Sequence, residues 1–167
     1  MPATYEPIAT TTLGSAQANY TFSSISGSYT DLVLVFQTGM SSAGNEPLLQ
    51  FNGDTGSNYS ETMIYGNGTT AYSFRNSIST AIQLARDVGL PSALESNHII
   101  QIQNYSNATT YKTLLARVNK GSATYSQAAA YVGLWRSTSA ITSITISTTA
   151  GNLVSGSTFT LYGIKAA

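Results

Sequence analysis

The chain of 167 residues is nearly free of charge, because only 8% of its residues are Asp, Glu, Lys or Arg and the two signs cancel. This balance excludes the basic stripe with which proteins hold a nucleic-acid backbone, so no nucleic acid is expected as a partner. Cysteine is absent, which excludes disulfide bridges and cysteine-ligated metal sites.

The first 13 residues predict an extended N-terminal arm ahead of a domain over 14–167. Pro2 and Pro7 lack an amide hydrogen, so this segment fits an edge strand or a strap better than a central strand. It has neither the basic nor the apolar region of a secretion signal, and no apolar run reaches the roughly 18 residues of a membrane span. We therefore expect synthesis in a cytoplasm and no membrane partner.

Short strands with turn signals between them follow the arm. Tyr20 and Phe22 alternate within 17–25, and residues 31–38 (DLVLVFQT) form the most continuous apolar run. Residues 48–52 and 61–65 predict two more strands, on either side of an Asn-Gly turn in 51–60. Residues 71–85 are ambiguous between strand and helix and are assigned as strand, and 86–97 are expected to form an irregular loop.

The pattern becomes regular again from His98 onwards. Strands are predicted over 98–105, 111–119 and 128–136, then over a final pair of runs between 141 and 165. About ten strands at spacings of 8–12 residues, without a long helix, indicate a single all-β sandwich or barrel. The apolar residues at period two are expected to be buried, namely Leu32, Val33, Val35, Ile100, Ile102, Leu114, Val118, Ile144, Ile146, Phe159 and Leu161.

Oxygen-bearing side chains gather in the turn at 52–61, which invites comparison with a calcium loop. Asn52, Asp54, Ser57 and Asn58 offer ligands, with Glu61 just beyond. A calcium loop normally contains more carboxylates, so an Asx-type turn is the preferred interpretation and no metal or cofactor is expected.

The sequence does not predict an enzyme. His98 is the only histidine, and no G-x-S-x-G elbow accompanies it, so a structural role is the better interpretation. The carboxylates mostly fall in or beside predicted turns, and nothing in their spacing favours a two-carboxylate hydrolase. Trp135 and the eleven tyrosines could stack on sugars, but partial burial of Trp135 against a neighbouring strand is expected instead.

Several segments resemble small structural proteins of tailed bacteriophages and their prophages. They are MPATYEPIATTTLGS at the start, FNGDTGSNYS at 51–60, QNYSNATTYKTLLAR at 103–117, LWRSTSAITSITI at 134–146 and GSTFTLYGIKAA at the end. Together these segments are scattered over nearly the whole chain, although none of them is a chemical site.

The resemblance implies a virion protein, and small all-β virion proteins of this kind are commonly jelly-roll capsid decoration (cement) proteins. The expectation is then an antiparallel, jelly-roll-like β-sandwich that binds the outer surface of the head as a homotrimer and stabilises the lattice of the major capsid protein. The arm would supply the contact to the capsid or within the trimer, through Pro2, Tyr5, Pro7 and Ile8. The alternative is a tail-fibre or baseplate module that binds host-surface glycans.

Overall fold

The computed structural model describes residues 4–42, 45–85, 93–121 and 126–165, and in these residues it contains strands and no helix. The strands, listed in chain order, are β1 (Tyr5–Thr12), β2 (Asn19–Phe22), β3 (Asp31–Thr38), β4 (Pro47–Phe51), β5 (Tyr59–Gly66), β6 (Ala71–Ser79), β7 (Ile82–Gln83), β8 (Ser96–Gln103), β9 (Lys112–Gly121), β10 (Ser126–Trp135), β11 (Ile144–Thr148) and β12 (Thr158–Ile164). No apolar helix of membrane-spanning length occurs in this part of the chain.

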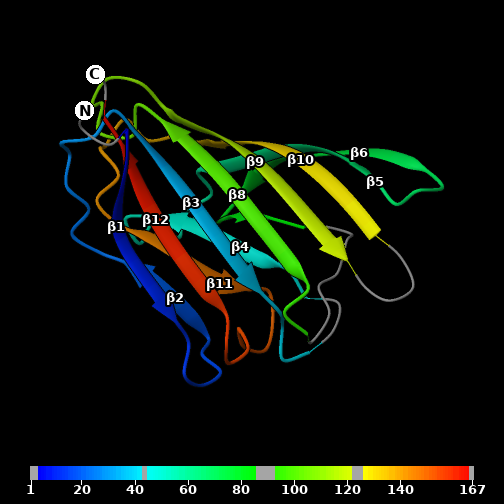
Figure 1. Ribbon diagram of the computed structural model, residues 1–167. Coiled ribbons are helices and arrows are strands. Elements are labelled where there is room, and N and C mark those ends of the chain that lie inside the picture. The colour runs from blue at the N-terminus through cyan, green and yellow to red at the C-terminus, as the bar shows by residue number, and fades with distance from the viewer. Residues whose placement is uncertain (1–3, 43–44, 86–92, 122–125, 166–167) are drawn as a thin grey trace.

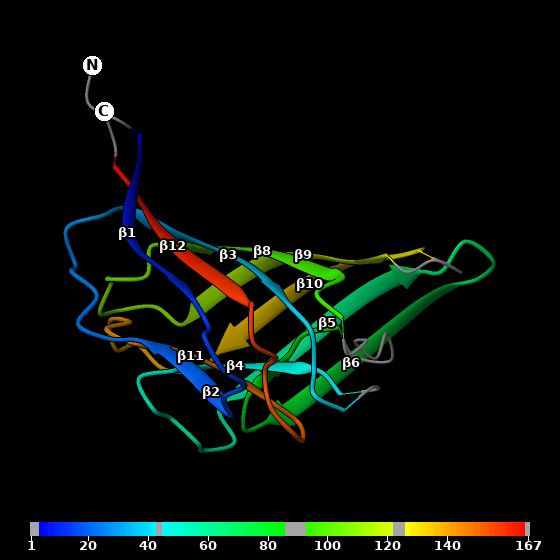
Figure 2. The same ribbon diagram turned by 60° about the horizontal axis from the view of Figure 1, so that its bottom comes forward.

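The strands form two antiparallel sheets that pack face to face (Figures 1 and 2). The large sheet has eight strands in the order β1-β12-β3-β8-β9-β10-β5-β6, and the small sheet has four in the order β2-β11-β4-β7. Figure 2 shows the two layers, with the β5–β6 hairpin extending to one side beyond the strands of the small sheet.

The winding of the chain is that of a jelly roll. Strands β1, β2, β3 and β4 lie alternately in the large and the small sheet, and β7, β8, β11 and β12 alternate in the order small, large, small, large. This alternation gives two four-stranded halves, β1-β12-β3-β8 and β2-β11-β4-β7. Two further hairpins, β5–β6 and β9–β10, are inserted into this winding and lengthen the large sheet beyond β8. The predicted all-β, jelly-roll-like sandwich is confirmed.

The core lies between the sheets and consists of the alternate residues of each strand. Ten of the eleven side chains predicted to be buried are buried, from Leu32 and Ile100 to Phe159 and Leu161. Val35 is the exception and is only half-buried. Its register partners are Ile99 and Thr160, which places it on the face of the large sheet that points away from the small sheet.

The N-terminal segment is part of the sandwich. Strand β1 pairs with β12 in regular antiparallel register on both sides of a bulge between Pro7 and Ala9, so its backbone groups are satisfied by the sheet. Glu6 of β1 and Lys165, the residue after β12, add an ion pair of 2.9 Å. Strand β1 is the outermost strand at this end, a position that tolerates the missing amide hydrogen of Pro7.

Strand boundaries differ from the sequence prediction by a few residues in several places. The ambiguous region 71–85 holds two strands, β6 and the very short β7. Strand β8 begins at Ser96, inside the segment expected to be an irregular loop, while 86–92 of that loop lie outside the described residues. Strand β10 begins at Ser126, ahead of the predicted 128. In each case pairing with a neighbouring strand extends the ladder beyond the clear apolar alternation.

Candidate functional site

The face of the large sheet that points away from the small sheet, called here the outer face, carries apolar side chains that no described element covers. Figure 1 looks onto this face. Ile64, Leu115 and Val132 project from it and are 63%, 52% and 50% exposed. Contiguous apolar residues on a surface commonly mark an interaction site, whereas isolated ones need no explanation.

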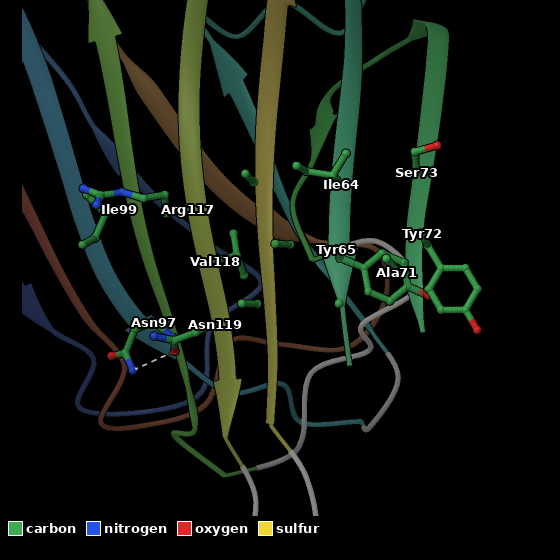
Figure 3. Close-up of a pocket in the computed structure, with 14 residues that line it drawn as sticks. Ile64, Tyr65, Ala71, Tyr72, Ser73, Asn97, Ile99, Arg117, Val118 and Asn119 are labelled. Carbon is green, nitrogen blue, oxygen red and sulfur yellow. Dashed lines mark hydrogen bonds between the residues drawn. The ribbon is translucent and has the colours of Figure 1, made fainter. Parts of the chain in front are cut away.

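A trough of about 910 Å³ lies on this face across β8, β9, β10, β5 and β6 (Figure 3). The strand registers show how it is assembled, because one cross-strand row runs through its centre. The row consists of Ile99, Arg117, Ala130, Ile64 and Ser73. The trough therefore depends on the two inserted hairpins, which supply every residue of this row except Ile99.

Small residues at the centre of the trough account for its depth. Ala128 and Ala130 of β10 are exposed and lie beside Gly66 and Ile64 of β5. Alanine and glycine are depleted in strands because they leave little side chain to pack on neighbours. Here they form a low floor, with the larger side chains of Ile64 and Ile99 on its two sides.

Among the described residues, Arg117 is the only charged one that lines the trough. It is exposed and forms neither an ion pair nor a hydrogen bond with any described residue. Figure 3 shows its side chain lying across β8 beside Ile99. The guanidinium therefore keeps its full set of donors for a group outside the chain.

Two asparagines lie at one end of the trough. The side-chain amide of Asn97 donates to Oδ1 of Asn119 at 3.3 Å, the interaction drawn in Figure 3. The backbone amide of Asn97 donates to the same oxygen at 3.3 Å. The Asn119 amide nitrogen remains available as a donor, so polar groups at this end complement the apolar floor.

The residues predicted to contact the capsid or a trimer partner lie elsewhere. Pro2 falls outside the described residues. Tyr5 and Pro7 are exposed on β1, with Tyr5 edge-on to Tyr162 at 6.4 Å, whereas Ile8 is half-buried and packs against the core. Strands β12 and β3 separate β1 from the trough, so these residues are not brought together with it.

The turn at 52–61 uses its oxygens for internal hydrogen bonds. Asp54 accepts from the Gly56 amide at 2.8 Å, from Asn58 Nδ2 at 2.9 Å and from Trp135 Nε1 at 2.7 Å. The bond from Trp135 lowers the pKa of Asp54 and outweighs the opposing effect of burial. This is the geometry of an Asx-type turn, in line with the preferred interpretation.

The other oxygens of that turn point in different directions. Asn52 accepts from the backbone amides of Thr142 and Ser143 and so fixes the loop before β11. Glu61 is buried in β5. Within the described residues, no group of three His, Asp or Glu side chains is placed to hold a metal ion.

His98 lies in the core of the sandwich. Its ring stacks on Phe36 at 4.2 Å between centroids, and its Nε2 is 2.8 Å from the Ser96 hydroxyl. Burial lowers the pKa of His98 to about 3, so the ring is neutral at physiological pH. The ring has no solvent access through which it could act on a substrate.

The aromatic residues form no single sugar-binding platform in the described part of the chain, because Tyr65 and Tyr72 stack on each other at 4.8 Å in the lining of the trough while Trp135 and Tyr5 lie apart from them. Trp135 is only 2% exposed, more deeply buried than expected, because its ring packs against Phe51 and Tyr59. The exposed Tyr5 and Tyr72 lie on β1 and β6, the two outermost strands of the large sheet. Their rings are therefore at opposite edges of the molecule.

Sequence reasoning did not find the trough. The available signals were the alanine run at 128–130 and apolar residues on the polar side of the strand alternation, such as Ile64 and Leu115. Neither signal shows that β5 and β9 lie on the two sides of β10, which only the sheet order reveals.

Neither the protein-family models nor the curated proteins compared with this chain match it. Among solved structures, it is similar to domains LG4-5 of the mouse laminin alpha1 chain, with 16% sequence identity and a TM-score of 0.35. The similarity covers 91% of this chain and 40% of the laminin chain. A likeness at this level carries no functional inference.

Proposed function

We propose that this protein is a structural component of a tailed bacteriophage, a decoration protein that binds the outer surface of the head as a homotrimer. Its partner is the major capsid protein, whose lattice it stabilises. The protein is then located on the virion, after synthesis in the host cytoplasm, and it needs no cofactor and catalyses no reaction.

The observation that carries the proposal is the uncovered outer face of the large sheet. Ile64, Leu115 and Val132 are each at least half exposed on one continuous surface, and Ile64 also lines the trough. Leaving such side chains in water costs roughly 25 cal/mol per Å² of apolar area, which association with a partner recovers. An assembly protein with few charges fits this surface, because burial and not long-range attraction holds it to its partner.

The resemblance to phage structural proteins supports the choice of partner, and symmetry explains how weak contacts suffice. A trimer presents three copies of the same surface to a lattice with the same local symmetry. Once one subunit binds, the others engage at high effective concentration, so the overall affinity exceeds that of any single contact.

The glycan-binding alternative has less support from the side chains. A sugar site needs an aromatic face next to polar groups, and Trp135 is buried while Tyr5 and Tyr72 lie at opposite edges of the large sheet. The trough is lined mainly by aliphatic, small and amide side chains, and its two tyrosines, Tyr65 and Tyr72, stack on each other at 4.8 Å at the β5–β6 end.

The copy number of the chain in purified particles tests the proposal. Quantitative mass spectrometry of phage particles, with the major capsid protein as internal standard, should give hundreds of copies per particle. The chain should also remain with heads after tails are removed. A handful of copies that separate with the tail would overturn the proposal in favour of the alternative.

A further inference from the structure

We propose that the trough on the outer face is the docking site for an extended, acidic segment of the capsid protein, with a carboxylate of that segment paired to Arg117. This inference names the contact of the function proposed above and rests on it. Its evidence, however, is separate and comes from the dimensions, charge and floor of the trough.

The dimensions of the trough suit an extended chain. It crosses five strands, and at about 4.8 Å between neighbouring strands this gives a length of roughly 19 Å. An extended chain rises about 3.3 Å per residue, so about six residues would fill it. Its volume of about 910 Å³ is near the upper limit for small-molecule pockets, and its open form suits a peptide segment better.

Charge complementarity identifies the partner as acidic. Of the described residues in the lining, Arg117 is the only charged one, so no carboxylate among them neutralises it, and its guanidinium has no partner in that part of the chain. A planar guanidinium binds a carboxylate through two parallel hydrogen bonds, which also fixes the position of the segment.

The remaining lining supplies the apolar and polar contacts that such a segment needs. Side chains on one face of the segment would contact Ile64 and Ile99 above the alanine floor. Asn119 offers an amide donor to a backbone carbonyl at the end of the trough. Because the floor residues have almost no side chain, the partner's backbone can approach the sheet closely.

The test compares binding of the full-length protein and two trough variants to purified heads that lack it. Ala130→Trp fills the floor, and Arg117→Glu reverses the charge. Each should lower occupancy on heads roughly tenfold or more, the effect expected when a central contact of an interface is lost. Both positions are exposed, so unchanged thermal unfolding midpoints should show that the variants fold.

Matched controls lie on the same face outside the trough. Thr113→Trp adds the same ring on β9, and Arg75→Glu makes the same charge reversal on β6. Both controls should lower occupancy on heads much less than the two trough variants do. An equal loss of occupancy on heads in the trough variants and the controls would overturn the assignment of the trough, because it would show that the contact with the capsid is spread over the outer face.

The remaining outcomes are also decisive. If the unmodified protein and all variants bind heads equally well, the trough inference fails while the decoration function stands. If the unmodified protein does not bind heads, both proposals fail. If sedimentation shows that Ala130→Trp converts a trimer into monomers, the trough holds a second copy of the chain and the capsid segment is ruled out.

Discussion

At the scale of single residues, His98 shows how the core fixes a protonation state. The Ser96 hydroxyl donates to the Asn119 carbonyl at 3.1 Å, so its oxygen accepts from His98 Nε2–H. Nδ1 then carries only a lone pair, and among the described residues it has no hydrogen-bond partner. Protonation would bury a second N–H without an acceptor, which adds to the cost of burying the charge.

This arrangement predicts a loss of stability in mild acid. The unfolded chain binds a proton at His98 near pH 6.5, whereas the folded protein binds it only near pH 3. The contribution of His98 to the free energy of unfolding is thus complete above pH 6.5. It falls by about 1.4 kcal/mol per pH unit as the pH drops from there toward 3. Urea unfolding at pH 7, 6, 5 and 4 measures the slope, and His98→Gln should remove this component. If the free energy of unfolding of that variant depends on pH as steeply as that of the unmodified protein, the acid sensitivity does not come from His98.

Asp54 gives a second prediction at this scale. Asp54→Ala removes the acceptor of the buried Trp135 N–H and two further hydrogen bonds, and should lower the free energy of unfolding by roughly 2–4 kcal/mol. Asp54→Asn keeps one carbonyl oxygen and should lose less.

Thermal unfolding of the unmodified protein with and without EDTA should give the same midpoint. A large drop on chelation would instead make the turn at 52–61 a metal site.

At the scale of secondary-structure elements, the two edges of the large sheet differ. Strand β1 is protected by Pro7 and a bulge, which discourage further strand pairing. Strand β6 lacks proline and pairs with β5 in unbroken register from Ala71 to Asn76, and its register shift lies beyond Asn76, toward Ser79. The edge next to the trough is therefore the more open one, and an extended partner can approach it along β6.

Strand glycines provide a matched test of packing at opposite ends of the sheet. A Cβ on Gly163 of β12 would collide with the Tyr29 ring, while one on Gly66 of β5 would meet nothing within 4 Å. Gly163→Ala should therefore destabilise the fold by about 1–3 kcal/mol, because an aromatic ring cannot flex out of the way. Gly66→Ala should be neutral or slightly stabilising. Equal effects in chemical denaturation would show that the contact with Tyr29 is not what matters.

The elements were largely predictable because strand periodicity is local. Alternation identified the core faces of β8, β9, β11 and β12, and turn residues such as Asn52 marked the breaks. The short β7 was missed, since two residues carry no periodic signal. The trough was missed for a different reason. It requires the pairing of β10 with β5, strands separated by two crossings of the sandwich, and alternation alone does not show which strands become neighbours.

At the scale of the whole molecule, the jelly roll and its inserted hairpins have different structural roles. The two four-stranded halves enclose the core, and the hairpins β5–β6 and β9–β10 extend one sheet beyond it. This extension makes the outer face of the large sheet broader than the jelly roll alone would make it. Such an arrangement lets the chain carry a binding surface on regular, hydrogen-bonded strands, which hold side chains more firmly than loops do.

We propose that this face binds the head of a phage. Cryo-electron microscopy of purified heads, with the protein added back to heads that lack it, tests the claim most directly. We expect new threefold-symmetric density on the outer surface, with the outer face of the large sheet against the capsid protein and Arg117 beside an acidic segment. A lattice that remains bare, or density found only at the tail, would contradict it.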